Sequence, residues 1–316
     1  MKKYLAKRLI HSIFLIWLVA TVVWIAMRML PGGPEVAILG EHPTQDEIQA
    51  LRTQLGLDRP LYVQYFEWFY QMLTLDFGRS FATGERITVL LNRALAQTLS
   101  IAWLGGVIGL LIAIPSGVIS ATRRNSWLDY GATLFAFLGL SIPAFYLGVL
   151  LALVFGVWAD LLPVFGYASL TEEGVVAWFK SILLPGIAVG TAYAAVIMRM
   201  MRSSLLEVKN QEYMTTAKAK GVAPRVRLYK HAIQNALIPV VTISGIQIAT
   251  LITGSVTVEL VFAYNGLGRL LVSSIFNNDY PVLQYAIMVV AAILIGANLV
   301  VDVIYTMIDP RIRYEE

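Results

Sequence analysis

Long apolar runs separated by short polar segments dominate the chain. A helix needs about 20 mainly apolar residues to cross the ~30 Å hydrocarbon core of a bilayer. Six segments reach that length, at residues 9–30, 95–120, 132–157, 182–201, 236–260 and 282–307. The pattern therefore predicts an all-α membrane protein with six transmembrane helices.

The largest polar interruption covers residues 31–94. Its Pro-Gly-Gly-Pro sequence at 31–34 is expected to break the first helix. Thr44 and Glu47 fit a capping box for a short helix that Gly56 would end. The aromatic residues at 65–70 suit a helix at the outer membrane–water interface. We predict an extracytoplasmic helical insert, which either covers the outer ends of the spans or docks another protein.

Charge predicts the orientation. With both termini in the cytoplasm, most of the 24 Lys and Arg residues fall on the inner side, as the positive-inside rule requires. The first domain is then a tail with the first span (1–30), and the insert (31–94) follows. The core (95–307) holds five spans and a cytoplasmic loop (202–235). A cytoplasmic tail (308–316) ends the chain.

Composition narrows the function classes. Only 14% of the residues are charged, against about 25% in ordinary soluble domains. The basic residues lie beside apolar spans, so membrane lipid is an expected partner and nucleic acid is not. There is no cysteine. We find no G-x-x-x-x-G-K-[ST], H-E-x-x-H or G-x-S-x-G motif, and the three histidines are far apart. We therefore expect no catalytic, cofactor-binding or metal site in this chain.

The most informative stretch is the basic segment 199–239 between the fourth and fifth spans. It carries eight Lys and Arg residues against two acids, Glu207 and Glu212. Small residues and good helix formers fill positions 215–220, and Gly221 is a helix stop. This pattern predicts a thin helix that fits the groove of another protein, although a solvated loop would carry the same charge.

Fixed residues at fixed spacing carry a family resemblance. The chain has Glu212-Tyr213, Thr216-Ala217 and Ala219-Lys220-Gly221, followed by His231-Ala232, Asn235-Ala236 and Pro239. This run resembles the cytoplasmic "EAA" loop of ABC importer permeases of the dipeptide/oligopeptide (and nickel) type, as found in their "B"-type membrane subunit. The sequences at 55–80, 278–282 and 309–314 extend the resemblance, as does Phe262–Arg269, where Asn265 replaces the usual Pro. The Asn-Gly pair at 265–266 is expected to keep that turn.

The resemblance implies a type I ABC importer permease fold and an ATP-driven importer of di- or oligopeptides. Glutathione, nickel complexes and oligosaccharides remain alternative cargoes. The implied partners are a second homologous permease, two ABC ATPase subunits that bind ATP and Mg, and an extracytoplasmic substrate-binding protein. The implied location is the cytoplasmic (inner) membrane of a prokaryote. The resemblance also implies an ATPase-coupling helix formed by Glu212, Tyr213, Thr215, Thr216, Ala217, Lys218, Ala219, Lys220 and Gly221.

Polar residues inside spans are costly, so they are candidates for the translocation pathway. Gln247, Thr250 and Glu259 are the candidates in the fifth span. Asp302 in the sixth span and Arg199 in the fourth are better explained as a packing partner and an inner-edge anchor. Such sparse charge, with no evident inverted repeat, argues against the competing class, a secondary transporter or channel.

Overall fold

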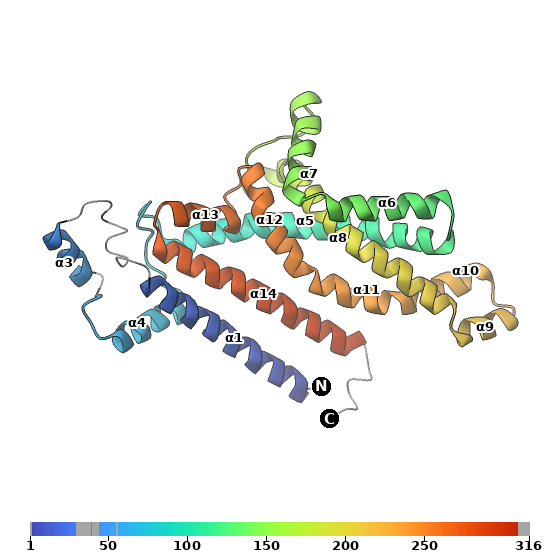
Figure 1. Ribbon diagram of the computed structural model, residues 1–316, viewed down its shortest axis with the longest axis horizontal. Coiled ribbons are helices and arrows are strands. Elements are labelled where there is room, and N and C mark those ends of the chain that lie inside the picture. Colours follow the sequence, from blue (N-terminus) through green and yellow to red (C-terminus); the bar gives the residue numbers. More distant parts are fainter. Residues whose placement is uncertain (1, 30–38, 40–43, 55, 309–316) are drawn as a thin grey trace. The chain divides into compact units, whose positions relative to one another are not determined.

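A computed structural model of the chain describes residues 2–29, 39, 44–54 and 56–308, and they are mainly helical (Figure 1). In chain order the elements are α1 (Lys2–Arg28), α3 (Gln45–Gln54), α4 (Leu61–Leu73), α5 (Ile87–Thr122), α6 (Trp127–Ser141), α7 (Ala144–Leu151), the π-helical η1 (Ala152–Trp158), α8 (Gly174–Lys209), α9 (Glu212–Ala219), α10 (Pro224–Val226), the π-helical η2 (Arg227–Ile233), α11 (Gln234–Ile246), α12 (Ile248–Val261), α13 (Leu267–Phe276) and α14 (Tyr280–Ile308). The predicted all-α class is confirmed.

Four helices are long and apolar enough to cross a bilayer, namely Ala6–Arg28, Ile87–Thr122, Gly174–Lys209 and Tyr280–Val303. The other two predicted spans are bent pairs. The α6 helix meets the α7–η1 pair at 104°, and the helix ending at Ile246 meets α12 at 43°. The described residues thus hold four spans, or six if each bent pair counts as one.

The sharper bend has a local cause. Proline disfavours the helical conformation of the residue before it, and Ile142, which precedes Pro143, is extended with φ −90° and ψ 119°. The predicted span 132–157 corresponds to this bent pair, which changes direction at Pro143. Apolar length alone does not reveal such a change.

The structure differs from two further expectations, both in the region after the fifth predicted span. The turn expected at Asn265-Gly266 falls earlier, at Phe262 and Ala263, where Ala263 has φ +55°. The outer loop expected at 262–269 also ends earlier, because α13 (Leu267–Phe276) begins within it. The Pro-Gly-Gly-Pro break at 31–34 and the terminal match at 309–314 lie outside the described residues.

Contacts divide the chain into two compact units. The first contains residues 98–264 with the terminal segments 1–8 and 297–316, and the second contains 9–97 and 265–296. In the first unit α8 is the central helix, because it packs against α6, α7, α11 and α12. Side chains along its length are fully buried, including Ile197, Met198, Met201 and Leu205.

Small residues let α5 approach α8 closely. A Cβ added at Gly190 would lie 2.5 Å from the carbonyl oxygen of Gly105, and one added at Gly109 would lie 2.5 Å from the Tyr193 ring. Gly105 and Gly109 are four residues apart on α5, as Gly186 and Gly190 are on α8. This is the small-residue spacing that brings membrane helices into backbone contact.

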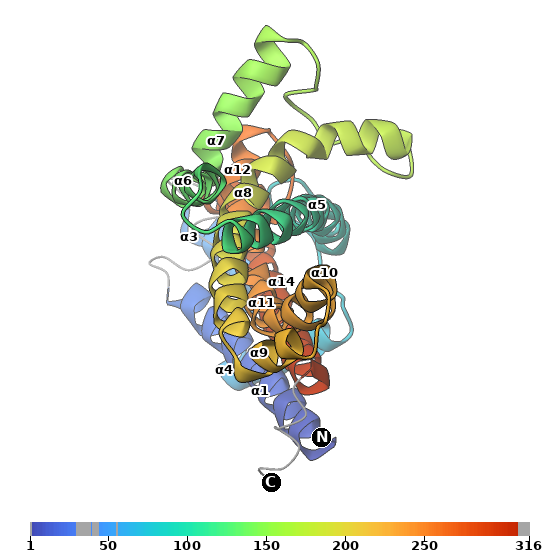
Figure 2. The ribbon, with the colours of Figure 1, turned by 90° about the vertical axis from the view of Figure 1, so that its right-hand side faces the viewer.

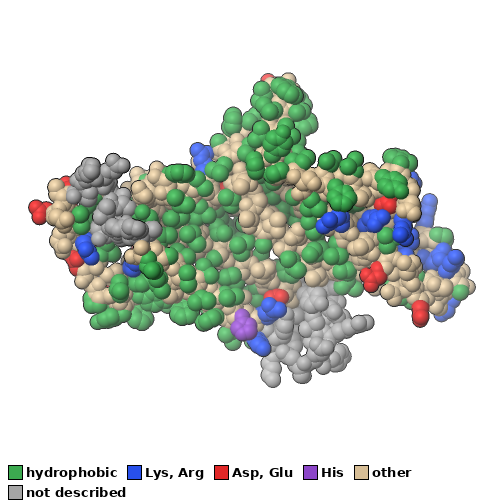
Figure 3. All heavy atoms as spheres, in the orientation of Figure 1, with side chains coloured by type: hydrophobic (Ala, Val, Ile, Leu, Met, Phe, Trp, Pro, Cys, Tyr) green, Lys and Arg blue, Asp and Glu red, His purple; other side chains and the backbone are tan. Residues whose placement is uncertain are grey.

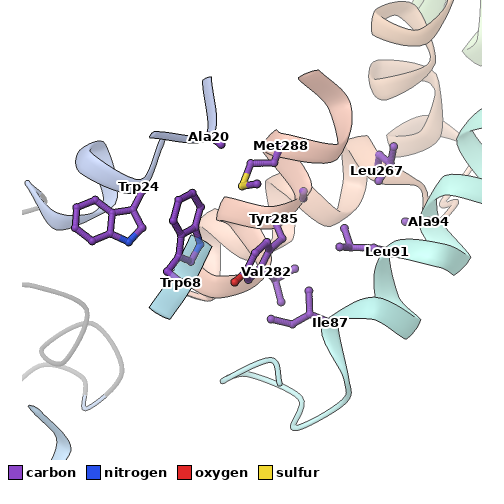
Figure 4. Close-up of a cluster of buried hydrophobic side chains, with 11 residues drawn as sticks. Ala20, Trp24, Trp68, Ile87, Leu91, Ala94, Leu267, Val282, Tyr285 and Met288 are labelled. Atoms are coloured by element: carbon purple, nitrogen blue, oxygen red, sulfur yellow. The ribbon is translucent and has the colours of Figure 1, made fainter. Parts of the chain in front are cut away.

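The second unit has an aromatic core. Trp24 of α1, Trp68 of α4 and Tyr285 of α14 are buried together with Ile87 and Leu91 of α5 (Figure 4). Burying rings of this size removes much apolar area from water and dominates the energy of such a core. The predicted aromatic helix at 65–70 is confirmed as part of α4.

Two sets of polar contacts in this unit cap the start of α3 and join the loop at 80–82 to the residue before α14. Thr44 and Glu47 form the predicted capping box, with Glu47 N–H donating to Thr44 Oγ1 at 3.3 Å. The backbone N–H and hydroxyl of Thr44 donate to the Glu47 carboxylate and lower the pKa of Glu47. Asp279, before α14, accepts hydrogen bonds from the Ser80 hydroxyl and from the N–H groups of Phe81 and Ala82.

Candidate functional site

The predicted coupling helix exists and ends where the sequence indicates. α9 follows α8 after Asn210 and Gln211, and Gly221 lies just beyond it with φ +75°. The Gly221 N–H donates to the Lys218 carbonyl, and the Val222 N–H donates to the Ala217 carbonyl, each at 3.1 Å. This pair of bonds is a Schellman motif, which needs a residue that tolerates positive φ. The prediction that Gly221 stops this helix is confirmed.

All nine predicted coupling residues lie on α9 or in the two residues after it. None is buried, and eight of them are exposed, with only Ala217 intermediate. Figures 1 and 2 show α9 and α10 at the far end of α8 and α11, and Figure 3 shows Lys and Arg side chains gathered there. In the described chain α9 thus presents a slim, unobstructed surface, with Glu212 at its start and Lys218 near its end.

A cleft of about 350 Å³ lies beside α9. Its lining residues come from the end of α8, from α9 and from 224–232, and they are Lys209, Met214, Thr215, Lys218, Pro224, Arg227, Leu228 and Ala232. Three are cations and none is acidic. Within the described residues the buried Nε of Arg227 has no hydrogen-bond partner. A carboxylate or phosphate would suit these donors.

The sequence pattern did not point to this cleft. The sequence assigns Lys218 to the coupling helix, but it explains Lys209 and Arg227 only as charges that set the membrane orientation, and that role requires no particular spacing. They converge only because α9 folds back toward η2, against which it packs. No local signal in the sequence reveals this return of the chain.

A buried ion pair also escaped prediction. Asp129 in the first turn of α6 accepts from Arg202 of α8, with Nε to Oδ1 at 2.8 Å and Nη2 to Oδ2 at 3.0 Å. Ser120 of α5 donates to the same carboxylate, and the Asn125 N–H donates at 2.9 Å. Asp129 is 3% exposed. The bidentate pair ties α6 and the end of α5 to α8, seven residues before α8 ends.

The pathway candidates fall into two places. Gln247 lies at the break between α11 and α12, and the Thr250 hydroxyl donates to its side-chain oxygen at 3.2 Å. Glu259 lies near the other end of α12, is fully buried, and accepts from the Thr98 hydroxyl at 2.6 Å. The structure brings Gln247 and Thr250 together and places Glu259 apart from them. Their pathway role stays a prediction.

Asp302 and Arg199, the other two charged residues considered in the spans, lie in positions that need no pathway role. Arg8 of α1 and Asp302 of α14 form an ion pair at 3.1 Å, as the packing interpretation of Asp302 expects. Arg199 is exposed on α8.

An all-α chain with several apolar spans and an exposed polar helix between two of them is typical of the membrane subunit of a transporter. Residues 113–314 match the family described as "Binding-protein-dependent transport system inner membrane component", and residues 1–102 match the N-terminal family that accompanies it. The chain belongs to this family of ABC importer permeases. The family expected from the sequence is thereby confirmed.

Curated relatives match over nearly their full length. The chain is 37% identical to "Probable peptide ABC transporter permease protein y4tP" of Sinorhizobium fredii, over 98% of this chain and 99% of that protein. It is 36% identical to "Oligopeptide transport system permease protein AppB" of Bacillus subtilis, over 99% and 100%. It is 35% identical to "Dipeptide transport system permease protein DppB" of Alkalihalophilus pseudofirmus, over 99% and 100%.

Solved structures agree on the fold. A chain of the MetNI methionine ABC transporter, in inward-facing conformations, matches with a TM-score of 0.56 at 20% identity, over 70% of this chain and 96% of that one. A chain of an amino acid ABC transporter with histidines matches with a TM-score of 0.51 at 12% identity, over 70% and 94%. The expected ABC importer permease fold is confirmed.

Proposed function

We propose that this permease forms half of the translocation pathway of an ATP-driven importer of di- or oligopeptides. The printed names of its full-length relatives support a peptide cargo. The proposed complex contains a second homologous permease, two ABC ATPase subunits and an extracytoplasmic substrate-binding protein. Its place is the inner membrane of a prokaryote, with both termini in the cytoplasm. Glutathione, nickel complexes or oligosaccharides are the alternative cargoes.

One observation carries the coupling part of the proposal. α9 is exposed, sharply ended, and connected directly to α8, the buried centre of its unit. The exposed helix α9, which another protein can contact, is thus joined to α8, the helix that packs against the most other helices of its unit. A displacement of α9 by an ATPase would reach the core through α8.

The nucleotide chemistry belongs to the partners in this proposal. ATP and Mg are bound by the ATPase subunits, and this chain binds no cofactor. ATP favours the closed ATPase pair because it binds that state more tightly, and this differential affinity supplies the bias for the conformational change. The permease contributes shape, and the basic cleft beside α9 would receive an acidic side chain of the ATPase.

A matched pair of substitutions tests the coupling role. Ala219 is exposed on α9, so Ala219→Trp adds bulk to the docking surface without filling the core. Ala159 is an exposed residue after η1, and Ala159→Trp adds the same bulk elsewhere. We expect Ala219→Trp to abolish uptake of a labelled dipeptide and co-purification of the ATPase. We expect Ala159→Trp to retain both.

The coupling assignment fails if Ala219→Trp co-purifies the ATPase and transports normally at wild-type abundance. Cargo is tested separately, because wild-type protein that drives ATP-dependent uptake of another solute but of no peptide would contradict only the peptide assignment. Uptake by the purified chain alone in liposomes without ATP would instead support the competing secondary transporter or channel.

A further inference from the structure

The second unit contains a cavity of about 290 Å³ that the coupling role does not use. Its walls come from the end of α1, the turn at 56–57, one side of α4, the loop at 77–81 and the first turns of α14. These segments are far apart in the sequence and belong to the same compact unit. The cavity is therefore a product of the fold and has no counterpart in a sequence motif.

Two buried side chains that line the cavity have unused hydrogen-bond donors. Gln284 Nε2 has no partner among the described residues, and Trp68 Nε1, which lies near the Tyr285 hydroxyl, forms no well-aligned hydrogen bond there; each residue is only 8% exposed. Buried polar groups in proteins are nearly always paired, because an unpaired one loses its hydration without compensation. Two such donors on one cavity indicate an occupant that supplies acceptors.

Charge on the cavity walls favours a negatively charged acceptor. Arg28 is held in place because it donates to Gln64 Oε1 from Nε at 3.3 Å and from Nη2 at 3.2 Å. Its guanidinium also lies 3.6 Å from the centre of the Trp24 ring. The acidic residue in the lining, Glu67, is already ion-paired with Arg59. Ionised acceptors make the strongest hydrogen bonds to such donors.

The rest of the lining is aromatic and suits an organic group. Phe77 and Tyr285 stack with their ring centres 4.3 Å apart, and Trp68 adds a third ring. Ligand pockets combine mostly apolar walls with a few polar groups that fix the orientation of the ligand.

The position of the cavity on α4 favours a ligand from water over a lipid. Tyr62, Phe66 and Tyr70 recur every four residues and are about two-thirds exposed, so they form one aromatic stripe. Gln64 and Trp68 line the cavity and lie on the opposite side of the same helix. Exposed aromatic stripes suit the membrane–water interface. If the stripe faces the interface, the cavity side faces away from it.

We propose that this cavity binds a small organic carboxylate from the aqueous phase. The carboxylate would accept from Gln284 Nε2, Trp68 Nε1 and the Arg28 guanidinium, and the organic part would pack against the aromatic wall formed by Phe77, Tyr285 and Trp68. This site goes beyond the proposed peptide path and does not depend on the coupling role of α9.

Equilibrium dialysis of the purified full-length chain in lipid nanodiscs tests the site with radiolabelled phenylacetate. Phenylacetamide is the neutral probe of matched shape. We expect phenylacetate to bind at least ten times more tightly than phenylacetamide. Inorganic phosphate at the same concentration should not displace it. Equal binding of the two organic probes, no binding of either, or displacement by phosphate would overturn the proposal.

Variants locate the binding. Gln284→Glu keeps the size of the side chain but puts a negative charge beside the carboxylate, so phenylacetate binding should fall at least ten-fold. Trp68→Phe keeps a ring but removes the N–H group, so binding should fall several-fold. Gln49→Glu makes the same charge change on the exposed side of α3 and should leave binding unchanged. Wild-type affinity in Gln284→Glu would place any bound phenylacetate outside this cavity and overturn the assignment.

Discussion

The close contact between α5 and α8 predicts that adding a methyl group at Gly190 destabilises the protein. A Cβ at Gly190 would lie 2.5 Å from the Gly105 carbonyl oxygen, 3.1 Å from its Cα and 3.2 Å from its carbonyl carbon. All three are backbone atoms, so no side chain can rotate to make room. To restore an ordinary contact of 3.4 Å, Gly190→Ala must move the two helices apart by about 0.9 Å.

The magnitude follows from two opposing terms. Overpacking a well-packed site costs about 1–3 kcal/mol, and a clash between backbones belongs at the upper end. The substitution also stabilises the helix by about 1 kcal/mol, because alanine has a higher helix propensity than glycine. We therefore expect Gly190→Ala to destabilise the protein by about 2 kcal/mol. Gly131 in α6 is the matched control, because a Cβ there meets nothing within 4 Å. Gly131→Ala should stabilise by about 0.5–1 kcal/mol.

The assay is the thermal unfolding midpoint of the purified chain in one detergent at a fixed heating rate, because membrane proteins often unfold irreversibly. Gly190→Ala should lower the midpoint by several degrees, and Gly131→Ala should leave it unchanged or raise it. A Gly190→Ala protein that melts at or above the wild-type midpoint would refute a backbone clash between α5 and α8. Equal losses in both variants would show that the glycines matter for a reason other than the helix contact.

Two further changes test buried polar contacts. Asp129→Asn removes the charge that pairs with Arg202. The Arg202 side chain is 31% exposed and water can solvate it, so the cost should be about 1–2 kcal/mol, below that of breaking a fully buried pair, and the same assay should show a fall. An unchanged midpoint would contradict a structural role for the pair. Glu259→Gln keeps an oxygen that can accept from Thr98, so abundance should change little. Reduced dipeptide uptake at equal abundance would support a pathway role, and unchanged uptake would contradict it.

Features defined by neighbours in the sequence were predictable. The capping box of Thr44 and Glu47 spans four residues, and the Schellman bond from Val222 to Ala217 spans six. Their energies depend on local backbone geometry, so the residue types suffice to predict them. The apolar runs were predictable for the same kind of reason, because bilayer thickness sets their length.

Contacts between distant residues were not predictable. Ser80 and Asp279 are 199 positions apart, and Arg202 and Asp129 are 73 apart. Each pair forms only after the helices have packed, and nothing in the spacing of the charges distinguishes a paired aspartate from a solvated one. The donors around the cavity of the second unit belong to the same class, since Trp68 and Gln284 come together only through the fold.

The direction of the spans was predictable only in part, and it bears on the proposed mechanism. From Gly186 to Lys209, α8 runs without a proline or a break, and it holds both the Gly190 contact and Arg202. The return connection through η2 and α11 instead contains a π-helical turn and the 43° bend near Gln247. A displacement of α9 would therefore move α8 as one rigid helix. On the α11–α12 side, the same displacement would change the bend angle near Gln247. In the proposed importer this asymmetry makes Gln247 and Thr250, rather than the buried Glu259, the residues whose surroundings change most when the ATPases close.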